Sequence, residues 1–195
     1  ASAGIVIGIV SMTGLGVRFA QIIIQIAYGQ LFPILLLTML ACIILGMGLP
    51  STAAYVIVAT VAAPALLQAG LSTLAANLFV FYFAIISFIT PPVAMASYAA
   101  SGIANSDTTK TSMKAFMLGI AGFIIPFLFV FHPGLLIVGT HALDTFYALL
   151  ITLHAVILMA IAFSGWCGFV LGIFTRAIIF VTACMLIFPN TLIDI

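Results

Sequence analysis

Charged side chains are almost missing from this sequence: Lys, Arg, Asp and Glu together make up 4% of its 195 residues. A water-soluble domain carries about 25% charged residues, because ionised side chains cover its surface. Here the hydrophobic fraction is 66% and the mean hydropathy is +1.50. The scarcity of charge excludes an ordinary soluble domain and indicates an integral membrane protein, whose surface faces the lipid bilayer.

The sequence also lacks the patterns that carry enzyme and nucleic-acid chemistry. Cys42, Cys167 and Cys184 stand alone, and without a C-x-x-C pair they are typical of buried free thiols rather than of a metal or redox site. No nucleophile–base pair, phosphate loop or metal-ligand spacing is present, so we expect no enzyme. The net charge of +1 comes without a basic stripe, so we expect no nucleic-acid partner.

The apolar runs are about 20 residues long, as in membrane-spanning helices, whereas the strands of a β-barrel alternate over roughly 10 residues. This predicts an all-α integral membrane protein. The sequence has no signal peptide and begins at Ala1 inside an apolar run, so we expect a longer polypeptide whose first helix is cut.

Five elements are predicted in chain order. Residues 1–32 are expected to form a truncated span and an interfacial arm helix, and residues 33–70 a re-entrant helical hairpin. An interrupted transmembrane helix follows over residues 71–104, and a transmembrane helix over residues 113–138. Residues 141–195 form a C-terminal extension with about two transmembrane helices.

The hairpin is predicted from a helix break, the run GMGLPST over residues 46–52. Pro33 can start the first arm, because the N–H that proline lacks has no partner in the first turn of a helix. The arm then has about 13 residues, too few to cross a hydrocarbon core of roughly 30 Å. Ser51 begins the second arm, and Gly70 is expected to close it as a C-terminal cap.

A second break, Thr90-Pro91-Pro92, interrupts the helix that Ser72 opens, because neither proline can donate a helical hydrogen bond. A half-helix is predicted to follow over residues 93–104. Two broken helices close together indicate a transporter binding site, because broken backbone survives at membrane depth only inside protein or beside a wet cavity. The alternative is that the breaks only bend packed helices.

The candidate site must use neutral groups, because none of the 88 residues between Arg18 and Asp107 is Asp, Glu, Lys, Arg or His. Unwound carbonyls suit a small hard cation such as Na⁺, and the positive N-terminal ends of half-helices suit a carboxylate. The predicted ion and substrate site comprises Gly46, Gly48, Pro50, Ser51, Thr52, Tyr55, Thr90, Pro91 and Pro92. The predicted Na⁺ ligands are the carbonyls of Gly46, Gly48 and Thr90, and no cofactor other than Na⁺ as coupling ion is expected.

Polar residues near the N-terminus predict the arm. Arg18, Gln21 and Gln25 share one helical face, so residues 17–28 are expected to lie in the membrane interface. One continuous tilted span, with Arg18 reaching the headgroups, is the alternative.

The basic residues predict the orientation. Lys110, Lys114 and Arg176 fall on one side of the bilayer and Arg18 on the other, which favours a cytoplasmic loop around Lys110. His154 lies inside a predicted span, where a hydrogen-bonded histidine is favoured over a ligand.

Taken together, these motifs resemble a known family, the large membrane subunit of the tripartite ATP-independent periplasmic (TRAP) transporters. In particular they resemble the fused 4TM/12TM permeases that work with TAXI-type binding proteins. The resemblance covers about residues 1–140 and is carried by GMGLPSTAAY (46–55), AAPAL (62–66), LFVFYF (78–83), ITPPVA (89–94), AASGIA (99–104) and PFLFV (126–130). Many relatives outside the TAXI group have Gly at the position of Ala94.

The resemblance implies an elevator-type carrier of two inverted repeats, of which this chain would be the second and the N-terminal repeat of the same permease the first. It implies Na⁺-coupled uptake of an organic acid across the bacterial inner membrane. A periplasmic TAXI-type solute-binding protein would deliver the acid, and a small membrane subunit or its fused equivalent would complete the assembly. Residues 46–52 would be the hairpin tip, and residues 90–92 the unwound part of the paired helix.

Two other classes remain as alternatives, a pore-forming channel subunit and a non-transporting membrane scaffold. A channel needs a continuous polar lining. The sequence has only two local polar spots, at the two breaks.

Overall fold

The computed structural model describes residues 2–137 and 141–187, and the prediction of an all-α chain is confirmed for them. The helices are α1 (Ser2–Thr13), α2 (Leu15–Ile26), α3 (Leu31–Gly46), α4 (Ser51–Gln68), α5 (Thr73–Ile86), α6 (Met95–Ile103), α7 (Thr108–Gly119), α8 (Ile125–Phe131), α9 (Ala142–Ser164) and α10 (Ile173–Ile187). Three short 3₁₀ helices lie between them, η1 (Ser87–Ile89), η2 (Ile120–Ile124) and η3 (Pro133–Leu136).

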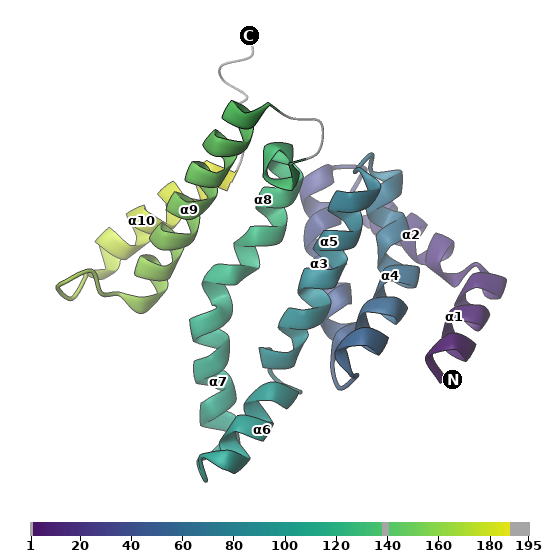
Figure 1. The fold of residues 1–195 in the computed structure, drawn as a ribbon, viewed down its shortest axis with the longest axis horizontal. Helices are drawn as coiled ribbons and strands as arrows, with labels where there is room; N and C mark the ends of the chain where they lie inside the picture. The colour runs from purple at the N-terminus through teal and green to yellow at the C-terminus, as the bar shows by residue number, and fades with distance from the viewer. Residues whose placement is uncertain (1, 138–140, 188–195) are drawn as a thin grey trace. The chain divides into compact units, whose positions relative to one another are not determined.

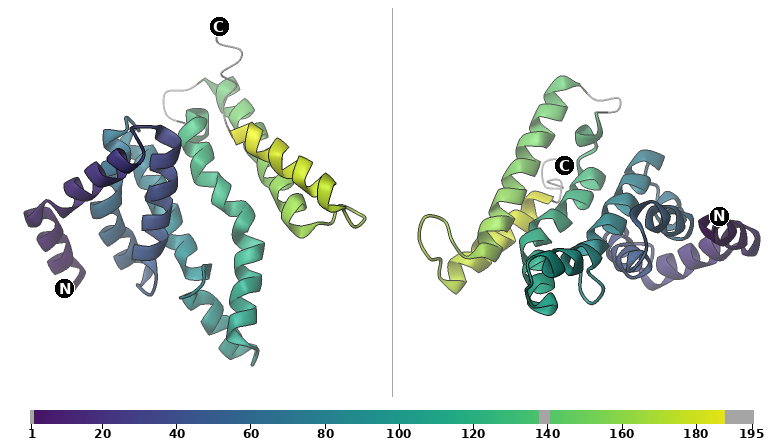
Figure 2. Two further views of the ribbon diagram at one scale, coloured as in Figure 1. Left: turned by 180° about the vertical axis from the view of Figure 1, so that it is seen from behind. Right: turned by 60° about the horizontal axis from the view of Figure 1, so that its bottom comes forward.

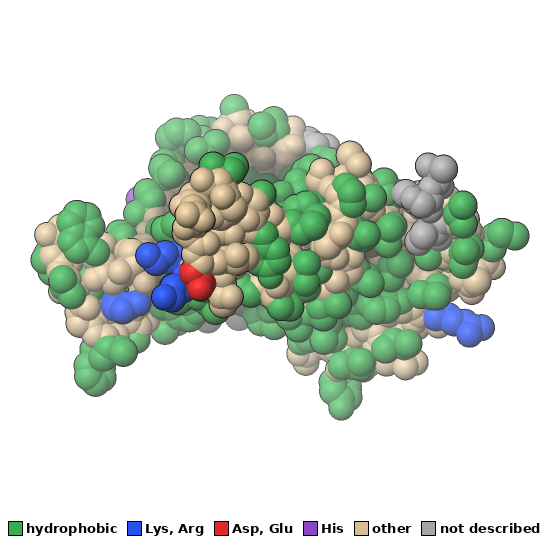
Figure 3. All heavy atoms as spheres, turned by 90° about the horizontal axis from the view of Figure 1, so that it is seen from below, with side chains coloured by type: hydrophobic (Ala, Val, Ile, Leu, Met, Phe, Trp, Pro, Cys, Tyr) green, Lys and Arg blue, Asp and Glu red, His purple; other side chains and the backbone are tan. Residues whose placement is uncertain are grey.

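Three helical stretches of the described chain are long and apolar enough to cross a membrane: Ser51–Gln68, Thr108–Phe131 and Ala142–Ser164. Hydrophobic side chains cover much of the face drawn in Figure 3, and charged ones are few there. Both observations fit a membrane protein. The first stretch is α4, so length alone does not separate a re-entrant arm from a full span at this helix.

The chain divides into two compact units, Ala1–Phe116 and Met117–Ile195. In the first unit, α3, α4 and α5 lie side by side (Figures 1 and 2). Their core contains the fully buried side chains of Ile34, Leu35, Val58, Leu66, Phe79 and Phe83. The rings of Phe79 and Phe83 meet edge to face, with centroids 4.9 Å apart, an arrangement that aromatic quadrupoles favour.

Helix α2 packs on α4 through a small residue. Gly14 separates α2 from α1 with a φ of 64°, a left-handed conformation that glycine adopts readily. A Cβ added at Gly16 would lie 2.4 Å from the carbonyl oxygen of Thr60, so only glycine allows this approach. Arg18 and the two glutamines of α2 are exposed on the other side of the helix. The placement of α2 in the membrane interface stays a prediction.

The C-terminus of α4 and the N-terminus of α5, which flank one loop, are both capped by hydrogen bonds. The N–H groups of Gly70 and Leu71 donate to the carbonyls of Leu67 and Leu66, the paired bonds that close a helix with a left-handed glycine (φ 91°). The hydroxyl of Ser72 accepts the N–H of Ala75 at 3.3 Å, which confirms the predicted start of this helix. The two caps fix the angle at which α5 returns along α4.

We expect Ser72→Ala to lower the free energy of unfolding by about 1 kcal/mol, because an N–H in the first turn of α5 loses its acceptor. Ser72→Gly should cost only a few tenths of a kcal/mol, since water then reaches the freed N–H. Denaturation of the purified protein in detergent, followed by circular dichroism, measures both. Equal losses in the two variants would contradict a capping role.

In the second unit, α9 and α10 run antiparallel, and the segment 165–172 joins them (Figure 2). The guanidinium of Arg176 donates from Nε to the carbonyl of Ala162 at 2.9 Å and from an Nη to that of Phe163 at 3.0 Å. These carbonyls end α9 and lack helical partners, so a cation there also suits the helix dipole. Nε2 of His132 donates to the carbonyl of Leu186 at 3.2 Å and links α8 to α10.

Several predicted boundaries differ from the structure. The first arm begins at Leu31 rather than at Pro33. The helix predicted over residues 113–138 begins at Thr108 and gives way to η2 in the turn before Pro126. Proline removes its own N–H and crowds the carbonyl four residues earlier, at Gly122, so the distortion falls on the N-terminal side. The half-helix expected from residue 93 begins at Met95. The parts of the predicted elements at residues 1, 138–140 and 188–195 lie outside the described residues.

Candidate functional site

The first break forms a tight tip between α3 and α4. Helix α3 ends at Gly46, and Met47 follows in an extended conformation (φ −61°, ψ 131°). Gly48 has a φ of 76°, which places it in the left-handed region that favours glycine. Pro50 stands as N-cap of α4, which begins at Ser51. The glycine and the proline of this run therefore reverse the chain within four residues, 47–50.

The second break lies between α5 and α6. Helix α5 tightens into η1, and Thr90 ends it in an extended conformation (φ −92°, ψ 121°). The Pro91–Pro92 peptide bond is cis. The hydroxyl of Tyr98 in α6 donates to the carbonyl of Pro92, so a side chain of the second half-helix holds the break.

The structure brings the two breaks into contact. A Cβ added at Gly46 would lie 2.8 Å from Oγ of Ser87 and 3.3 Å from the carbonyl oxygen of Ala84. A Cβ at Gly48 would lie 3.7 Å from a methyl group of Val93. The end of α3 thus rests on the end of α5, and the tip lies against the residue that follows Pro92. Glycine permits the approach because any side chain at Gly46 would occupy the space of Ser87.

The predicted hydroxyls have different surroundings. Thr90 is 9% exposed, and its Oγ1 donates to the carbonyl of Ile86 at 2.9 Å, which leaves the oxygen lone pairs free. Ser51 and Thr52 are exposed, as is Pro50. Of the predicted hydroxyl groups, that of Thr90 is the one that belongs to a buried residue.

Tyr55 is directed elsewhere. Its hydroxyl donates to Oδ1 of Asn77 at 3.3 Å, and its ring meets that of Phe81 edge to face with centroids 5.3 Å apart. Asn77 lies in the first half of α5, whereas Ser87 and Thr90 follow the last residue of that helix. Tyr55 therefore joins α4 to α5, and the structure does not bring its hydroxyl to the second break.

Carbonyl oxygens without hydrogen-bond partners occur at both breaks. The carbonyl of Gly46 accepts one long bond, 3.5 Å from the N–H of Leu49. Among the described residues, no N–H or O–H donates to the carbonyls of Gly48 and Thr90. Free carbonyl oxygens of this kind are ligands that hard cations prefer.

The N-termini of two helices, α4 and α6, also lie at the breaks. Within the described residues, the N-cap residues Pro50 of α4 and Ala94 of α6 make no side-chain capping bond, so backbone N–H groups stay available at both. Ser97, in the first turn of α6, is 3% exposed, and its Oγ has no hydrogen-bond partner among the described residues. A buried hydroxyl without a partner costs about 1–3 kcal/mol, which a bound ligand can recover.

Neither Ser87 nor Ser97 was predicted from the sequence. Both are small polar residues within a few positions of the prolines, in a stretch without charges. That proximity is the signal in the sequence. Their burial, and the contact of Ser87 with Gly46, came from the packing of α3, α5 and α6.

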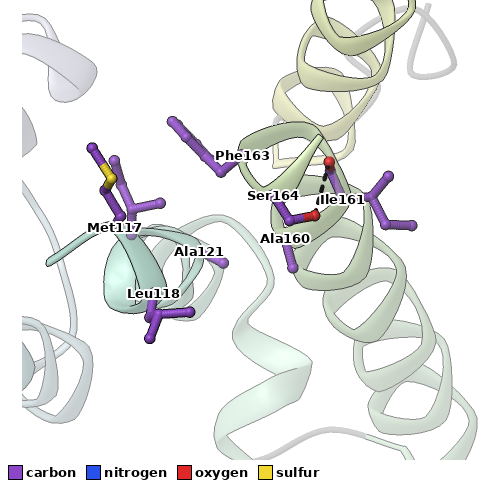
Figure 4. A pocket seen from close by; sticks show the side chains of 8 residues that line it. Met117, Leu118, Ala121, Ala160, Ile161, Phe163 and Ser164 are labelled. Carbon is purple, nitrogen blue, oxygen red and sulfur yellow. Dashed lines mark hydrogen bonds between the residues drawn. The ribbon is translucent and has the colours of Figure 1, made fainter. Parts of the chain in front are cut away.

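An apolar groove of about 410 Å³ lies in the second unit, and its walls come from α7, η2 and α9 (Figure 4). Its lining consists of Met117, Leu118, Ile120, Ala121, Ala160, Ile161, Phe163 and Ser164. The hydroxyl of Ser164 donates to the carbonyl of Ile161 at 3.3 Å within its own helix. Ser164 is the one polar side chain in this lining, so the groove offers an organic acid few hydrogen-bond donors.

The described chain is thus a polytopic helical membrane protein in which two broken helices meet through neutral groups. Residues 1–143 match the family model described as Tripartite ATP-independent periplasmic transporter, DctM component. The match covers more than half of the chain, which therefore belongs to this family of transporter permeases and not to an enzyme family. The predicted resemblance to TRAP transporters is confirmed at this level. No curated protein and no solved structure matched the chain.

Proposed function

We propose that this TRAP permease takes up an organic acid together with Na⁺, and that both bind where the hairpin tip meets the second break. The main support for this proposal is that Gly46 lies against Ser87 and Gly48 against Val93. These contacts join two breaks that lie far apart in the sequence. Free carbonyls and uncapped helix N-termini occur together there. Free carbonyl oxygens suit a cation, and helix N-termini suit an anion.

In this proposal the carbonyls of Gly46, Gly48 and Thr90, with Oγ1 of Thr90, hold the sodium ion. The N–H groups at the starts of α4 and α6, with the hydroxyls of Ser51, Thr52 and Ser97, receive the carboxylate. Tyr55 acts by holding α4 on α5 rather than as a ligand. The absence of Asp, Glu, Lys, Arg and His from 88 consecutive residues supports ion coupling through neutral oxygens rather than through a proton relay.

We further propose a more specific identity for the permease, which the sequence motifs suggest. The chain is the second inverted repeat of an elevator-type carrier of the fused TAXI type in the bacterial inner membrane, with the Lys110 loop on the cytoplasmic side. Its partners are the N-terminal repeat, a small membrane subunit or its fused equivalent, and a periplasmic binding protein. The family supports a binding protein and a small subunit in general terms.

Uptake into liposomes tests the proposal. The complete permease is reconstituted, the binding protein is added outside with a radiolabelled organic acid, and a sodium or a proton gradient is imposed. We expect uptake only with the sodium gradient. Equal uptake from a proton gradient without sodium would overturn the coupling, and no uptake of any carboxylate would overturn the substrate class.

We expect Ser97→Ala to stabilise the ligand-free permease by about 1 kcal/mol and to weaken its apparent affinity for the acid roughly 5-fold. The variant removes a buried hydroxyl that has no hydrogen-bond partner among the described residues. In the proposal the bound acid supplies that partner. Thermal unfolding in detergent and the concentration dependence of uptake measure the two effects.

Ser112→Ala is the matched control. Ser112 is equally buried at 3% exposure, but its hydroxyl already donates to the carbonyl of Thr108 at 2.7 Å. It should show neither gain in stability nor loss of affinity. A Ser97 variant that behaves like this control would remove Ser97 from the binding site.

A further inference from the structure

Tyr98 of α6 binds the second break on both sides of one residue, Val93. The side-chain hydroxyl of Tyr98 donates to the carbonyl of Pro92, which precedes Val93. The backbone N–H of Tyr98 donates to the carbonyl of Ala94, which follows Val93, at 2.9 Å. The carbonyl of Val93 itself accepts the N–H of Met95 at 3.1 Å. This short segment is therefore fixed to the first two turns of α6.

The carbonyl of Pro92 depends on the tyrosine hydroxyl for its hydrogen bond. Because α6 begins at Met95, this carbonyl lies outside the hydrogen-bond ladder of the helix. Within the described part of the chain, no other N–H or O–H group donates to it. Hydrocarbon offers no replacement donor, so at membrane depth such a bond is not exchanged for one to solvent. Without the hydroxyl, the peptide group after Pro92 loses the bond that orients it.

Val93 is also the residue on which the hairpin tip rests. A Cβ added at Gly48 would lie 3.7 Å from a methyl group of Val93. The position of Val93 therefore determines how closely the tip approaches the second break. The hydroxyl of Tyr98 acts on that approach through Val93, although it belongs to a different helix from the tip.

We propose that Tyr98 is a positioning residue for the ion site: its hydroxyl fixes Val93 where the hairpin tip closes on it, and thereby sets the affinity for the coupling ion. This inference rests on the proposed function, in which carbonyls of the tip and of the second break hold sodium together. A bond that only stabilised α6 would change the free energy of unfolding and leave the ion affinity as it is. The two roles therefore differ in what they change.

Tyr98→Phe keeps the ring and removes the donor. In liposomes with the complete permease and its binding protein, we expect this variant to raise the sodium concentration for half-maximal uptake by about 2- to 13-fold. The net contribution of one neutral hydrogen bond corresponds to this range in an equilibrium constant. The uptake rate at saturating sodium should change less than about 2-fold, because bound sodium then favours the closed tip.

Two matched substitutions identify the donor as the cause. Para-aminophenylalanine in place of Tyr98 keeps an N–H donor where the hydroxyl was and should restore the sodium dependence of the wild type. Tyr147→Phe removes a hydroxyl that makes no hydrogen bond with any described residue and should also leave it unchanged. Unchanged sodium dependence in Tyr98→Phe, or an equal rise in the para-amino variant, would overturn the proposal.

Hydrogen exchange of the permease in detergent, without sodium or substrate, tests the positioning of Val93 independently of transport. The N–H of Met95 is protected by the carbonyl of Val93. We expect this amide to exchange about 2- to 13-fold faster in Tyr98→Phe and at the wild-type rate in the para-amino variant. A wild type whose uptake ignores sodium would overturn the proposed function. Equal exchange in the wild type and Tyr98→Phe would overturn the positioning role, whatever drives uptake.

Discussion

Thr90→Val is expected to raise the sodium concentration that gives half-maximal uptake by about 5- to 150-fold. Valine keeps the shape of threonine but removes Oγ1, which is buried at the second break. The proton of that hydroxyl is bound to the carbonyl of Ile86, so the lone pairs are free for a cation. Leaving a buried ion without one ligand costs about 1–3 kcal/mol, which corresponds to this range. Uptake into liposomes at a series of sodium concentrations measures it.

Three further variants test whether the lost oxygen is the cause of such a change. Thr90→Ser retains the oxygen and should retain the sodium dependence. Thr60→Val removes a similar hydroxyl, which donates to the carbonyl of Ile57 at 2.8 Å in α4, and should also leave sodium dependence intact. Pro91→Ala should weaken it, because the helix can re-form across the break and withdraw the Thr90 carbonyl. Unchanged sodium dependence in both Thr90→Val and Pro91→Ala, with folding intact, would place the ion elsewhere.

Gly46→Val is expected to reduce uptake at least 10-fold in protein that still inserts and folds. The first added carbon would lie 2.8 Å from Oγ of Ser87 and 3.3 Å from the carbonyl oxygen of Ala84. The serine can rotate away, but the carbonyl belongs to the backbone of α5 and cannot. Overpacking of this kind costs about 1–3 kcal/mol, and the cheapest relief is to move the tip away from the second break. Initial uptake rates at saturating sodium and substrate measure the loss.

Gly102→Val provides the control for this prediction. Gly102 lies in α6, and nothing stands within 4 Å of the position that its Cβ would occupy. Its substitution should leave uptake nearly unchanged. The smaller change Gly46→Ala should be relieved in part by Ser87→Ala, because that substitution removes the nearer of the two clashing atoms. Full activity in Gly46→Val would show that transport does not need the contact of the breaks.

The sequence by itself was enough to predict the class of the protein and the nature of its site. With so few charged residues, a water-soluble fold is excluded by solvation alone. Glycine and proline break helices for local steric reasons. The breaks at residues 46–52 and 90–92 could therefore be predicted without knowledge of tertiary contacts. The 88-residue stretch without Asp, Glu, Lys, Arg or His then restricted the candidate site to neutral oxygens and backbone.

Only the tertiary structure decided which of these groups meet. The sequence does not tell which of the tip residues faces the second break; packing of α3 on α5 brings Gly46 to Ser87 and leaves Ser51 and Thr52 exposed. The tertiary structure also directs the hydroxyl of Tyr55 to Asn77, and it buries Ser97 without a hydrogen-bond partner in the described part of the chain. Contacts between residues far apart depend on how whole helices pack, and no local preference encodes that. The breaks are therefore a property of the local sequence, whereas their meeting is a property of the fold.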